Sequence, residues 1–307
     1  MLLYEAKSFA EVYNYALEDL YRYPEYETKP RGLTVKENLN VGLVMTDPTL
    51  SVYNNLKRSS QYSYIAGELL WYFSGRDDAK FISNFSKFWL NLQSQSGNVN
   101  SAYGDLLFKR GENEPISQWE WAYQSLLKDK DTRQAILHFN RPYHQHFDNK
   151  DFVCTMHGTF HIRNNKLHFT INMRSNDAIL GLPTDVAFFV MLQKQMLKHL
   201  KDTYPDLEMG TYTHFDASLH IYENNFELVE EMLKNEFIQD CLPEIGIDFI
   251  NKDGSPTIEL SKTIDAVEKY IEKKTGGKEC TLYPPICVKH DPLFKWIIDK
   301  INKKKNF

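Results

Sequence analysis

The sequence has few residues of the kinds that mark specialised protein classes. Its 307 residues include only 4 cysteines, 14 glycines and 12 prolines. Four scattered cysteines cannot build the disulfide framework of a small secreted domain, and so little glycine and proline excludes a fibrous chain. No stretch approaches the roughly 18 apolar residues of a membrane span, and the first residues lack the segments of a secretory signal. We therefore expect a globular, cytoplasmic protein without a membrane partner.

An excess of charge of one sign is also missing. The formal net charge is -5, from 36 basic and 41 acidic residues. Proteins that hold a nucleic-acid backbone need a strongly basic surface, so polymeric DNA or RNA is not an expected partner. Apolar residues make up 42% of the chain and aromatic residues 14%, which supports a packed core.

Hydrophobic spacing predicts helices packed on a mixed sheet, the arrangement of an α+β fold. The predicted helices cover residues 9–23, 65–74, 117–130 and 186–202. The predicted strands cover residues 33–48, 133–139 and a hairpin at 159–173 that turns at Asn164 and Asn165. After about residue 236 the chain becomes charged and ends in a Lys-rich run. We predict a catalytic domain at 1–235 and an appendage of unknown role, packed on it, at 236–307.

The densest polar cluster follows Cys154 and includes Arg174, Ser175 and Asp185. Arginine beside a hydroxyl suits a phosphate monoester, although a structural ion pair is the plainer interpretation of Arg174. A cation near Cys154 favours the reactive thiolate, although most isolated cysteines are inert buried residues. Asp185 can bind a ligand or can cap the helix predicted to begin near Val186.

The remaining histidines and cysteines do not form a metal site. His157, His161 and His168 lie in the predicted hairpin without a carboxylate or thiolate at ligand spacing, so no metal is expected. Cys280 and Cys287 bracket a proline-rich loop and are interpreted as structural thiols.

A series of short motifs follows one order along the chain. They are GELLW at 67–71, FW at 88–89, SAYG at 101–104, DTR at 131–133, FVC at 152–154, RSND at 174–177, LGLPTD at 180–185 and SLHIY at 218–222. This order resembles the thymidylate synthase family and, within it, the viral deoxycytidylate (dCMP) hydroxymethylases. The resemblance implies a two-layer fold with a largely antiparallel sheet, a homodimer, and 5,10-methylenetetrahydrofolate and a pyrimidine nucleoside monophosphate as partners.

The resemblance also implies roles for individual residues. The catalytic residues it implies are Cys154 as nucleophile, Glu68 for proton transfer, Asp185 and Tyr103. The substrate-binding residues it implies are Arg31, Arg133, Arg174, Ser175, His220 and Tyr222, with Arg133 reaching the phosphate of the other subunit. The folate-binding residues it implies are Trp89, Asp177 and Gly181.

Several positions depart from the thymidylate synthase pattern. Thr155 follows the cysteine where those enzymes have histidine, and Asp185 replaces an asparagine; both resemble the hydroxymethylase branch. Gln134 stands in place of a second arginine, which leaves one phosphate contact open, and either Lys29 or Arg31 can supply another. The closing segment over the folate is not visible, and the region from 236 onward has no evident counterpart in the family.

Asp185 indicates a cytosine base. Cytosine offers a donor at N4 and an acceptor at N3, which a carboxyl group sharing one proton can satisfy, whereas an asparagine matches uracil. We therefore expect hydroxymethylation of dCMP or CMP at C5. The alternatives are C5 methylation of dCMP or dUMP and a non-catalytic nucleotide-binding protein, against which the presence of both Cys154 and Glu68 argues.

Overall fold

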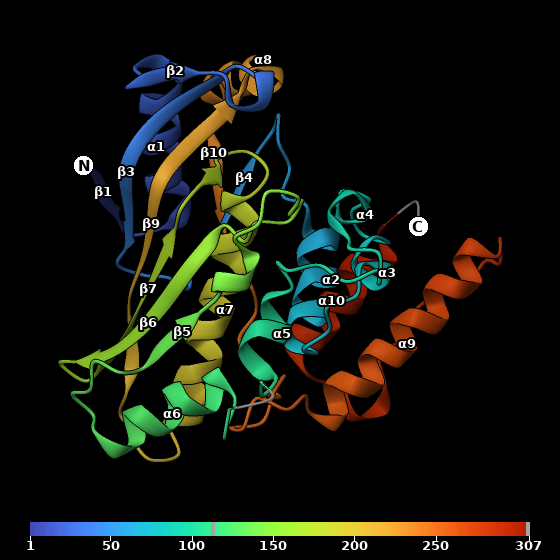
Figure 1. The fold of residues 1–307 in the computed structure, drawn as a ribbon. Helices are drawn as coiled ribbons and strands as arrows, with labels where there is room; N and C mark the ends of the chain where they lie inside the picture. Colours follow the sequence, from blue (N-terminus) through green and yellow to red (C-terminus); the bar gives the residue numbers. More distant parts are fainter. Residues whose placement is uncertain (112–113, 305–307) are drawn as a thin grey trace. The chain divides into compact units, whose positions relative to one another are not determined.

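The computed structural model describes residues 1–111 and 114–304, without the side chain of Arg31. The chain divides into two compact units, each made of discontinuous segments (Figure 1). Unit 1 comprises residues 1–60, 129–136 and 154–242, and unit 2 comprises 61–128, 137–153 and 243–307. The predicted boundary at residue 236 does not coincide with this division, because the C-terminal segment clusters with the helices of residues 61–128.

Unit 1 is built on a mixed sheet. Its strands follow the order β1 (Leu2–Ala6), β3 (Val35–Met45), β9 (Glu208–Tyr222), β7 (Lys166–Met173) and β6 (Thr155–Arg163). The β1–β3 and β7–β9 pairs are parallel, and the β3–β9 and β6–β7 pairs are antiparallel. Shorter strands complete the unit: β2 (Tyr26–Thr28) on β3, β8 (Asn176–Asp177) on β9, and β4 (Val52–Asn55) paired with β10 (Phe237–Asp240). This arrangement confirms the predicted α+β class.

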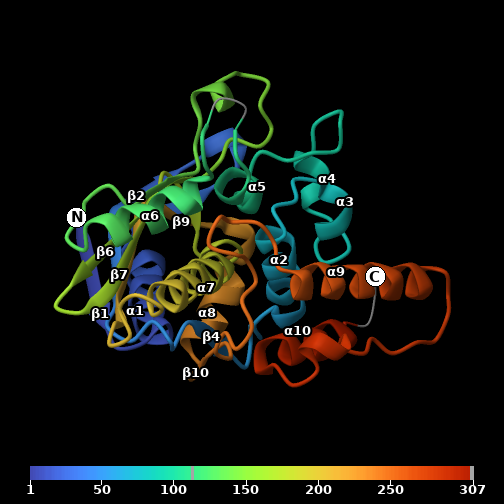
Figure 2. The same cartoon turned by 90° about the horizontal axis from the view of Figure 1, so that it is seen from below.

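Helices of unit 1 cover the sheet (Figures 1 and 2). They are α1 (Phe9–Arg22), α7 (Leu182–Leu200) and α8 (Phe226–Leu233), with short turns η1 (Pro30–Gly32) and η3 (Glu223–Asn225). Helix α1 begins with a capping box, in which Ser8 and Glu11 satisfy each other's backbone N–H groups. Helix α7 is buried along most of its length against β7 and β9, as its nearly continuous apolar sequence predicts.

The β6–β7 hairpin sets the position of the polar cluster. Asn164 and Asn165 adopt φ values of 50° and 57°, the left-handed conformation that a tight two-residue turn requires. The hairpin therefore forms as predicted, and Cys154 and Arg174 flank its open end. The strand predicted at 133–139 is shorter than expected, since β5 covers only Ile136–His138.

Unit 2 is mainly helical, with α2 (Tyr62–Phe73) at its centre. Every residue of α2 from Ile65 to Phe73 is buried, and the helix packs against α3, α5 and α10. Gly75 follows Ser74, the C-cap of α2, with φ 67°, a left-handed conformation that favours glycine. The other elements are α3 (Ala79–Ile82), α4 (Trp89–Leu92), α5 (Tyr103–Phe108), α6 (Gln118–Lys128), η2 (Pro142–His144), α9 (Ile258–Thr275), η4 (Ile286–Val288) and α10 (Pro292–Asn302).

A glycine allows α5 to approach α2 closely. A Cβ atom at Gly104 would lie 1.6 Å from the backbone oxygen of Tyr72, a distance that no side chain can adopt. Only glycine fits where one backbone lies directly on another. Gly104 therefore fixes the position of Tyr103, the first residue of α5.

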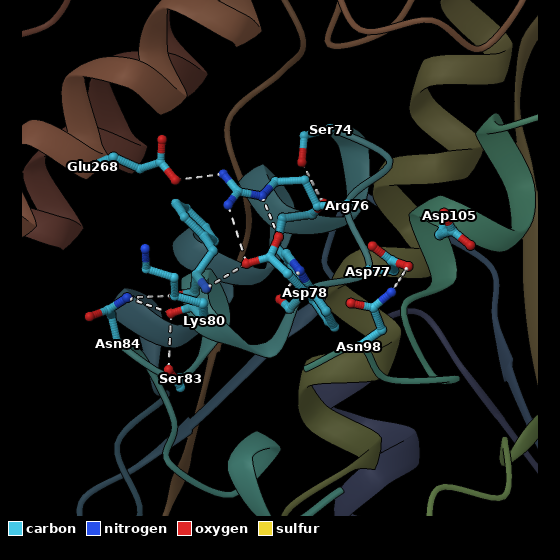
Figure 3. Close-up of polar contacts among 12 residues, drawn as sticks. Ser74, Arg76, Asp77, Asp78, Lys80, Ser83, Asn84, Asn98, Asp105 and Glu268 are labelled. Atoms are coloured by element: carbon cyan, nitrogen blue, oxygen red, sulfur yellow. Dashed lines mark hydrogen bonds and ion pairs between the residues drawn. The ribbon is translucent and has the colours of Figure 1, made fainter. Parts of the chain in front are cut away.

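The C-terminal helices are integrated into unit 2. The Arg76 guanidinium lies 2.7 Å from a carboxylate oxygen of Asp78 and 2.7 Å from one of Glu268 on α9 (Figure 3). Because this guanidinium bonds two carboxylates, it joins α9 to the segment that follows α2. None of the helices in the described part of the chain is long and apolar enough to cross a membrane. That residues 236–307 form an appendage to a catalytic domain stays a prediction.

Candidate active site

Unit 1 places a guanidinium beside a thiol. The backbone N–H of Arg174 donates to the carbonyl oxygen of Cys154 at 2.9 Å, and Arg174 Nη2 lies 3.5 Å from Cys154 Sγ. Both side chains are half-buried. A fixed positive charge at this distance favours the thiolate, the nucleophilic form of cysteine. The hairpin therefore brings together two residues that lie 20 positions apart in the sequence.

The chain continues from Arg174 through Ser175 into β8, where Asp177 pairs with His220 of β9. The His220 ring is buried and packs edge-on against Tyr222, with ring centroids 5.0 Å apart. Burial lowers the pKa of His220 below its usual value, and the neighbouring carboxylates, led by Asp177, act against this effect. A neutral imidazole beside a phenol can hydrogen-bond a sugar hydroxyl, which is compatible with the role that the resemblance implies.

Asp177, Gly181 and Asp185 follow one another at intervals of four residues. The Gly181 N–H donates to the Asp177 carbonyl at 3.1 Å, and the Asp185 N–H donates to the Gly181 carbonyl at 3.0 Å. A Cβ atom at position 181 would lie 2.6 Å from Asn176 Oδ1 and 3.2 Å from Asp185 Oδ2. Gly181 therefore leaves room for both of these polar side chains.

The capping alternative for Asp185 is wrong. Helix α7 begins at Leu182 rather than near Val186, and its N-cap is Gly181. Pro183 fixes the backbone of the first turn, which starts the helix earlier than the apolar pattern alone suggests. Asp185 lies inside this turn, so its carboxyl group is not needed as an N-cap and can serve another purpose.

Beneath this turn lies a buried polar network that the sequence reasoning missed. Tyr212 OH lies 2.8 Å from His214 Nδ1, and Asn176 Nδ2 lies 3.1 Å from His214 Nε2. Asp216 Oδ1 lies 3.3 Å from the same His214 Nε2, and both residues are fully buried. Burial, followed by the charges of Asp185 and Asp216, raises the pKa of Tyr212 well above its usual value. The alternation of Tyr212, His214 and Asp216 along β9 is the signal that could have revealed the network.

The other residues predicted to bind phosphate, Arg133 and either Lys29 or Arg31, belong to other segments of unit 1. Arg133 and Gln134 are exposed on the 129–136 segment, and no hydrogen bond in the described part of the chain joins Arg133 to the thiol or its guanidinium. Lys29 is exposed next to η1, whereas the Arg31 side chain lies outside the described residues. Their roles therefore stay predictions.

Two of the three hairpin histidines lie opposite each other, and His157 is opposite Asn172. His161 is directly opposite His168 across β6 and β7, and His168 Nδ1 lies 2.9 Å from Thr211 Oγ1. Burial, with the charges of Arg163 and His168, lowers the pKa of His161. The described residues contain no cluster of three or more side chains that could bind a metal.

Unit 2 carries Glu68, Trp89 and Tyr103 on α2, α4 and α5. The Glu68 side chain is buried, with 4% of the residue exposed. This burial raises the pKa of Glu68 to about 7, against hydrogen bonds from Tyr64 and Tyr72 that lower it. A carboxyl group that titrates near neutral pH is suited to move protons in both directions.

Two tyrosines connect these three residues, and the sequence reasoning missed both. The Trp89 indole N–H donates to Tyr64 OH at 3.1 Å, and Tyr64 OH donates to Glu68 Oε1 at 2.7 Å. The Tyr72 ring stacks on Tyr103, with centroids 5.1 Å apart and an interplanar angle of 14°. Their spacing of four residues on either side of Glu68 is a signal that could have found them.

An open pocket of unit 2 lies next to α4. It is lined mainly by polar residues from two segments, 90–100 and 146–150. None of the residues predicted to act in the site lines this pocket, although Trp89 directly precedes Leu90 at its edge.

Comparison with known proteins identifies the family of this chain. The family model described as thymidylate synthase matches residues 54–273. The match continues past residue 236, so the expectation that this region has no counterpart in the family is wrong for residues 236–273. A solved structure, thermostable thymidylate synthase A from Bacillus subtilis, shares the fold with a TM-score of 0.62 at 18% identity, over 76% of this chain and 86% of that chain.

Two phage proteins are among the similar curated sequences. Deoxycytidylate 5-hydroxymethyltransferase of Enterobacteria phage T4 is 30% identical over 178 residues, which cover 56% of this chain and 71% of that protein. Deoxyuridylate hydroxymethyltransferase of Bacillus phage SP01 is 26% identical over 217 residues, which cover 67% of this chain and 55% of that protein. The chain belongs to the thymidylate synthase family and is a one-carbon transferase.

Proposed function

We propose that the protein transfers a hydroxymethyl group to C5 of a cytosine nucleotide, dCMP or CMP. The observation that carries this proposal is the Asp185 carboxyl group, which lies in the first turn of α7 beside Gly181 and is not its cap. A carboxyl group can accept from N4 of cytosine and share a proton with N3. Both phage relatives are named hydroxymethyltransferases, which supports hydroxymethyl over methyl as the product.

The reaction begins at Cys154. Its thiolate, beside the Arg174 guanidinium, adds to C6 of the pyrimidine, and C5 becomes nucleophilic. Asp185 stabilises this adduct by holding a proton at N3. Arg174 and Ser175 bind the phosphate, while His220 and Tyr222 orient the sugar.

The one-carbon unit comes from 5,10-methylenetetrahydrofolate. Asp177 suits its pterin ring, since a carboxylate accepts from the N–H groups of the ring, and Trp89 is proposed to contribute the apolar face of its indole to folate binding. One Asp177 oxygen already accepts from the N–H groups of Ile179 and Leu180, which fixes the orientation of the carboxylate.

Glu68 moves the protons. Because its pKa is about 7, it exists in both forms at neutral pH and can take the C5 proton through water. C5 attacks the methylene carbon of the folate, and departure of tetrahydrofolate with loss of the C5 proton leaves an exocyclic methylene group on C5. Water adds to this methylene carbon and Cys154 leaves C6, so the nucleotide gains one CH2O unit. Tyr103, fixed by Gly104, is proposed to assist this proton transfer.

The test is mass spectrometry of products after incubation with methylenetetrahydrofolate and, separately, dCMP, CMP and dUMP. We expect a cytosine nucleotide to gain CH2O. A gain of CH2 identifies a methylating enzyme, and no product with any nucleotide favours a non-catalytic binding protein.

The second candidate is hydroxymethylation of dUMP. The SP01 relative is named for deoxyuridylate, so members of this group differ in the base. Reaction with dUMP alone in the same assay would show that Asp185 does not select the base.

We also propose a homodimer in which Arg133 binds the phosphate of the partner subunit. Its exposure on unit 1 is compatible with this role. Sedimentation at micromolar concentration should give a dimer, and Arg133→Ala should raise KM for the nucleotide. A monomer under these conditions contradicts the proposal.

A further inference from the structure

Glu68 lies between two tyrosines on the same helix, each one turn away. Tyr64 precedes it by four residues and Tyr72 follows it by four, and residues at this spacing are neighbours on a helix surface. Tyr64 OH donates to Glu68 Oε1 at 2.7 Å, and hydrogen bonding from Tyr72 acts with that of Tyr64 to lower the pKa of the carboxyl group. The buried carboxyl group therefore has a tyrosine one turn away on each side along α2, and Tyr64 bonds it directly.

The direction of the bonds on one side is fixed by chemistry. An indole N–H can only donate, so Trp89 Nε1 donates to the Tyr64 oxygen at 3.1 Å. A phenol has a single O–H proton, and Tyr64 donates it in the hydrogen bond to Glu68. The sequence Trp89 to Tyr64 to Glu68 is thus an ordered chain of donors, and each bond strengthens the next.

The other side is fixed by packing. The Tyr72 ring stacks on the Tyr103 ring at 5.1 Å, and the close approach of Gly104 to the Tyr72 backbone holds α5 against α2. Trp89 is likewise wedged edge-on against Trp71, with centroids 4.9 Å apart. Rotation of Tyr72 away from Glu68 would disturb its stack on Tyr103, and rotation of Tyr64 would break its hydrogen bond with Trp89.

We propose that Tyr64 and Tyr72 are positioning residues that hold the Glu68 carboxylate ready for proton transfer and join it to Trp89 and Tyr103. This inference rests on the proposed function for the role of Glu68. It adds Tyr64 and Tyr72, which lie outside all of the family motifs. It also links the three predicted residues of unit 2, Glu68, Trp89 and Tyr103, into one group.

Removal of either hydroxyl has a defined electrostatic consequence. Hydrogen bonds to the charged form favour that form, so both tyrosines lower the pKa of Glu68 against the larger effect of burial. Tyr64→Phe and Tyr72→Phe should each raise the titration midpoint of Glu68 by about one pH unit, the shift that corresponds to a charged hydrogen bond of about 1.5 kcal/mol. The double variant should shift it further.

The experiment is an infrared titration of the whole chain between pH 5 and pH 9. The stretching band of the protonated Glu68 carboxyl group is assigned by its loss in Glu68→Gln. Tyr62→Phe is the matched control, because Tyr62 lies on the same helix but packs on Trp296, with Lys300 above its ring. We expect the midpoint to rise in the Tyr64 and Tyr72 variants and to stay unchanged in the control.

An unchanged midpoint in both folded variants overturns the proposal and leaves the tyrosines a packing role. The acidic limb of the kcat profile should move to higher pH by the same amount, with KM for the nucleotide nearly unchanged. Absence of turnover in the parent protein counts against the proposed function instead, and the infrared titration still decides the role of the tyrosines.

Discussion

The two units hold their predicted site residues in different ways. In unit 1 the backbone positions them, since Cys154 and Arg174 flank a hairpin and His220 lies in a paired strand. In unit 2 side chains position them, since Glu68 and Trp89 are joined through a tyrosine. Replacing a site residue in unit 1 should therefore remove the function of that residue and leave the neighbouring site residues in place. Replacing one in unit 2 should also displace the side chains that it holds.

The largest effect is expected at the nucleophile of unit 1. Cys154→Ala should lower turnover about a thousandfold or more, because no other group can form the covalent adduct. Nucleotide binding, measured by calorimetry, should persist because Arg174 remains. Cys241→Ala, at an exposed cysteine of the same unit, is the control. A Cys154→Ala variant with a tenth of the parent activity contradicts the covalent mechanism.

The next effect tests packing in unit 2. Gly104→Ala should destabilise the protein by about 3 kcal/mol, because its Cβ would overlap the Tyr72 backbone oxygen and force α5 away from α2. Urea unfolding measures this loss. Gly111→Ala should be tolerated, since its Cβ would meet only the movable Glu114 side chain. Equal stability of the two variants would show that α5 is free to move.

A smaller effect tests base selection in unit 1. Asp185→Asn should reverse the preference between dCMP and dUMP, by about ten- to a hundredfold in kcat/KM, because the amide matches uracil. Asp206→Asn, at an exposed aspartate of unit 1, should change neither value. If the Asp185→Asn variant keeps the preference for dCMP, then Asp185 does not select the cytosine base.

The smallest effect concerns the charge of Glu68. Its pKa is raised from 4.5 to about 7 in the folded protein, so between these values the unfolded chain is ionised first and stability falls as pH rises. Glu68→Gln removes this penalty but retains a buried amide, so it should stabilise the protein by about 1 to 2 kcal/mol at pH 8. At pH 4.5 the gain should vanish. Urea unfolding at both pH values checks the sign, and an equal gain at both excludes a charge effect.

Much of the fold could be predicted from local sequence. The helix over residues 186–202 and the hairpin at Asn164 and Asn165 follow from apolar spacing and turn chemistry, which act between near neighbours. The start of α7 could not be placed this way, because Pro183 and the glycine before it extend the helix beyond its apolar pattern. The division into units was also missed, since it depends on contacts between segments far apart in the sequence.

The sequence by itself determined the family, because the order of the motifs around Cys154, Arg174 and Glu68 can be read without knowledge of the fold. Only the tertiary structure decided what surrounds them. The guanidinium beside the thiol depends on the pairing of β6 with β7, and the charge of Glu68 depends on its burial. Distances and desolvation arise when separate segments meet, so they are properties of the folded chain and not of any motif within it.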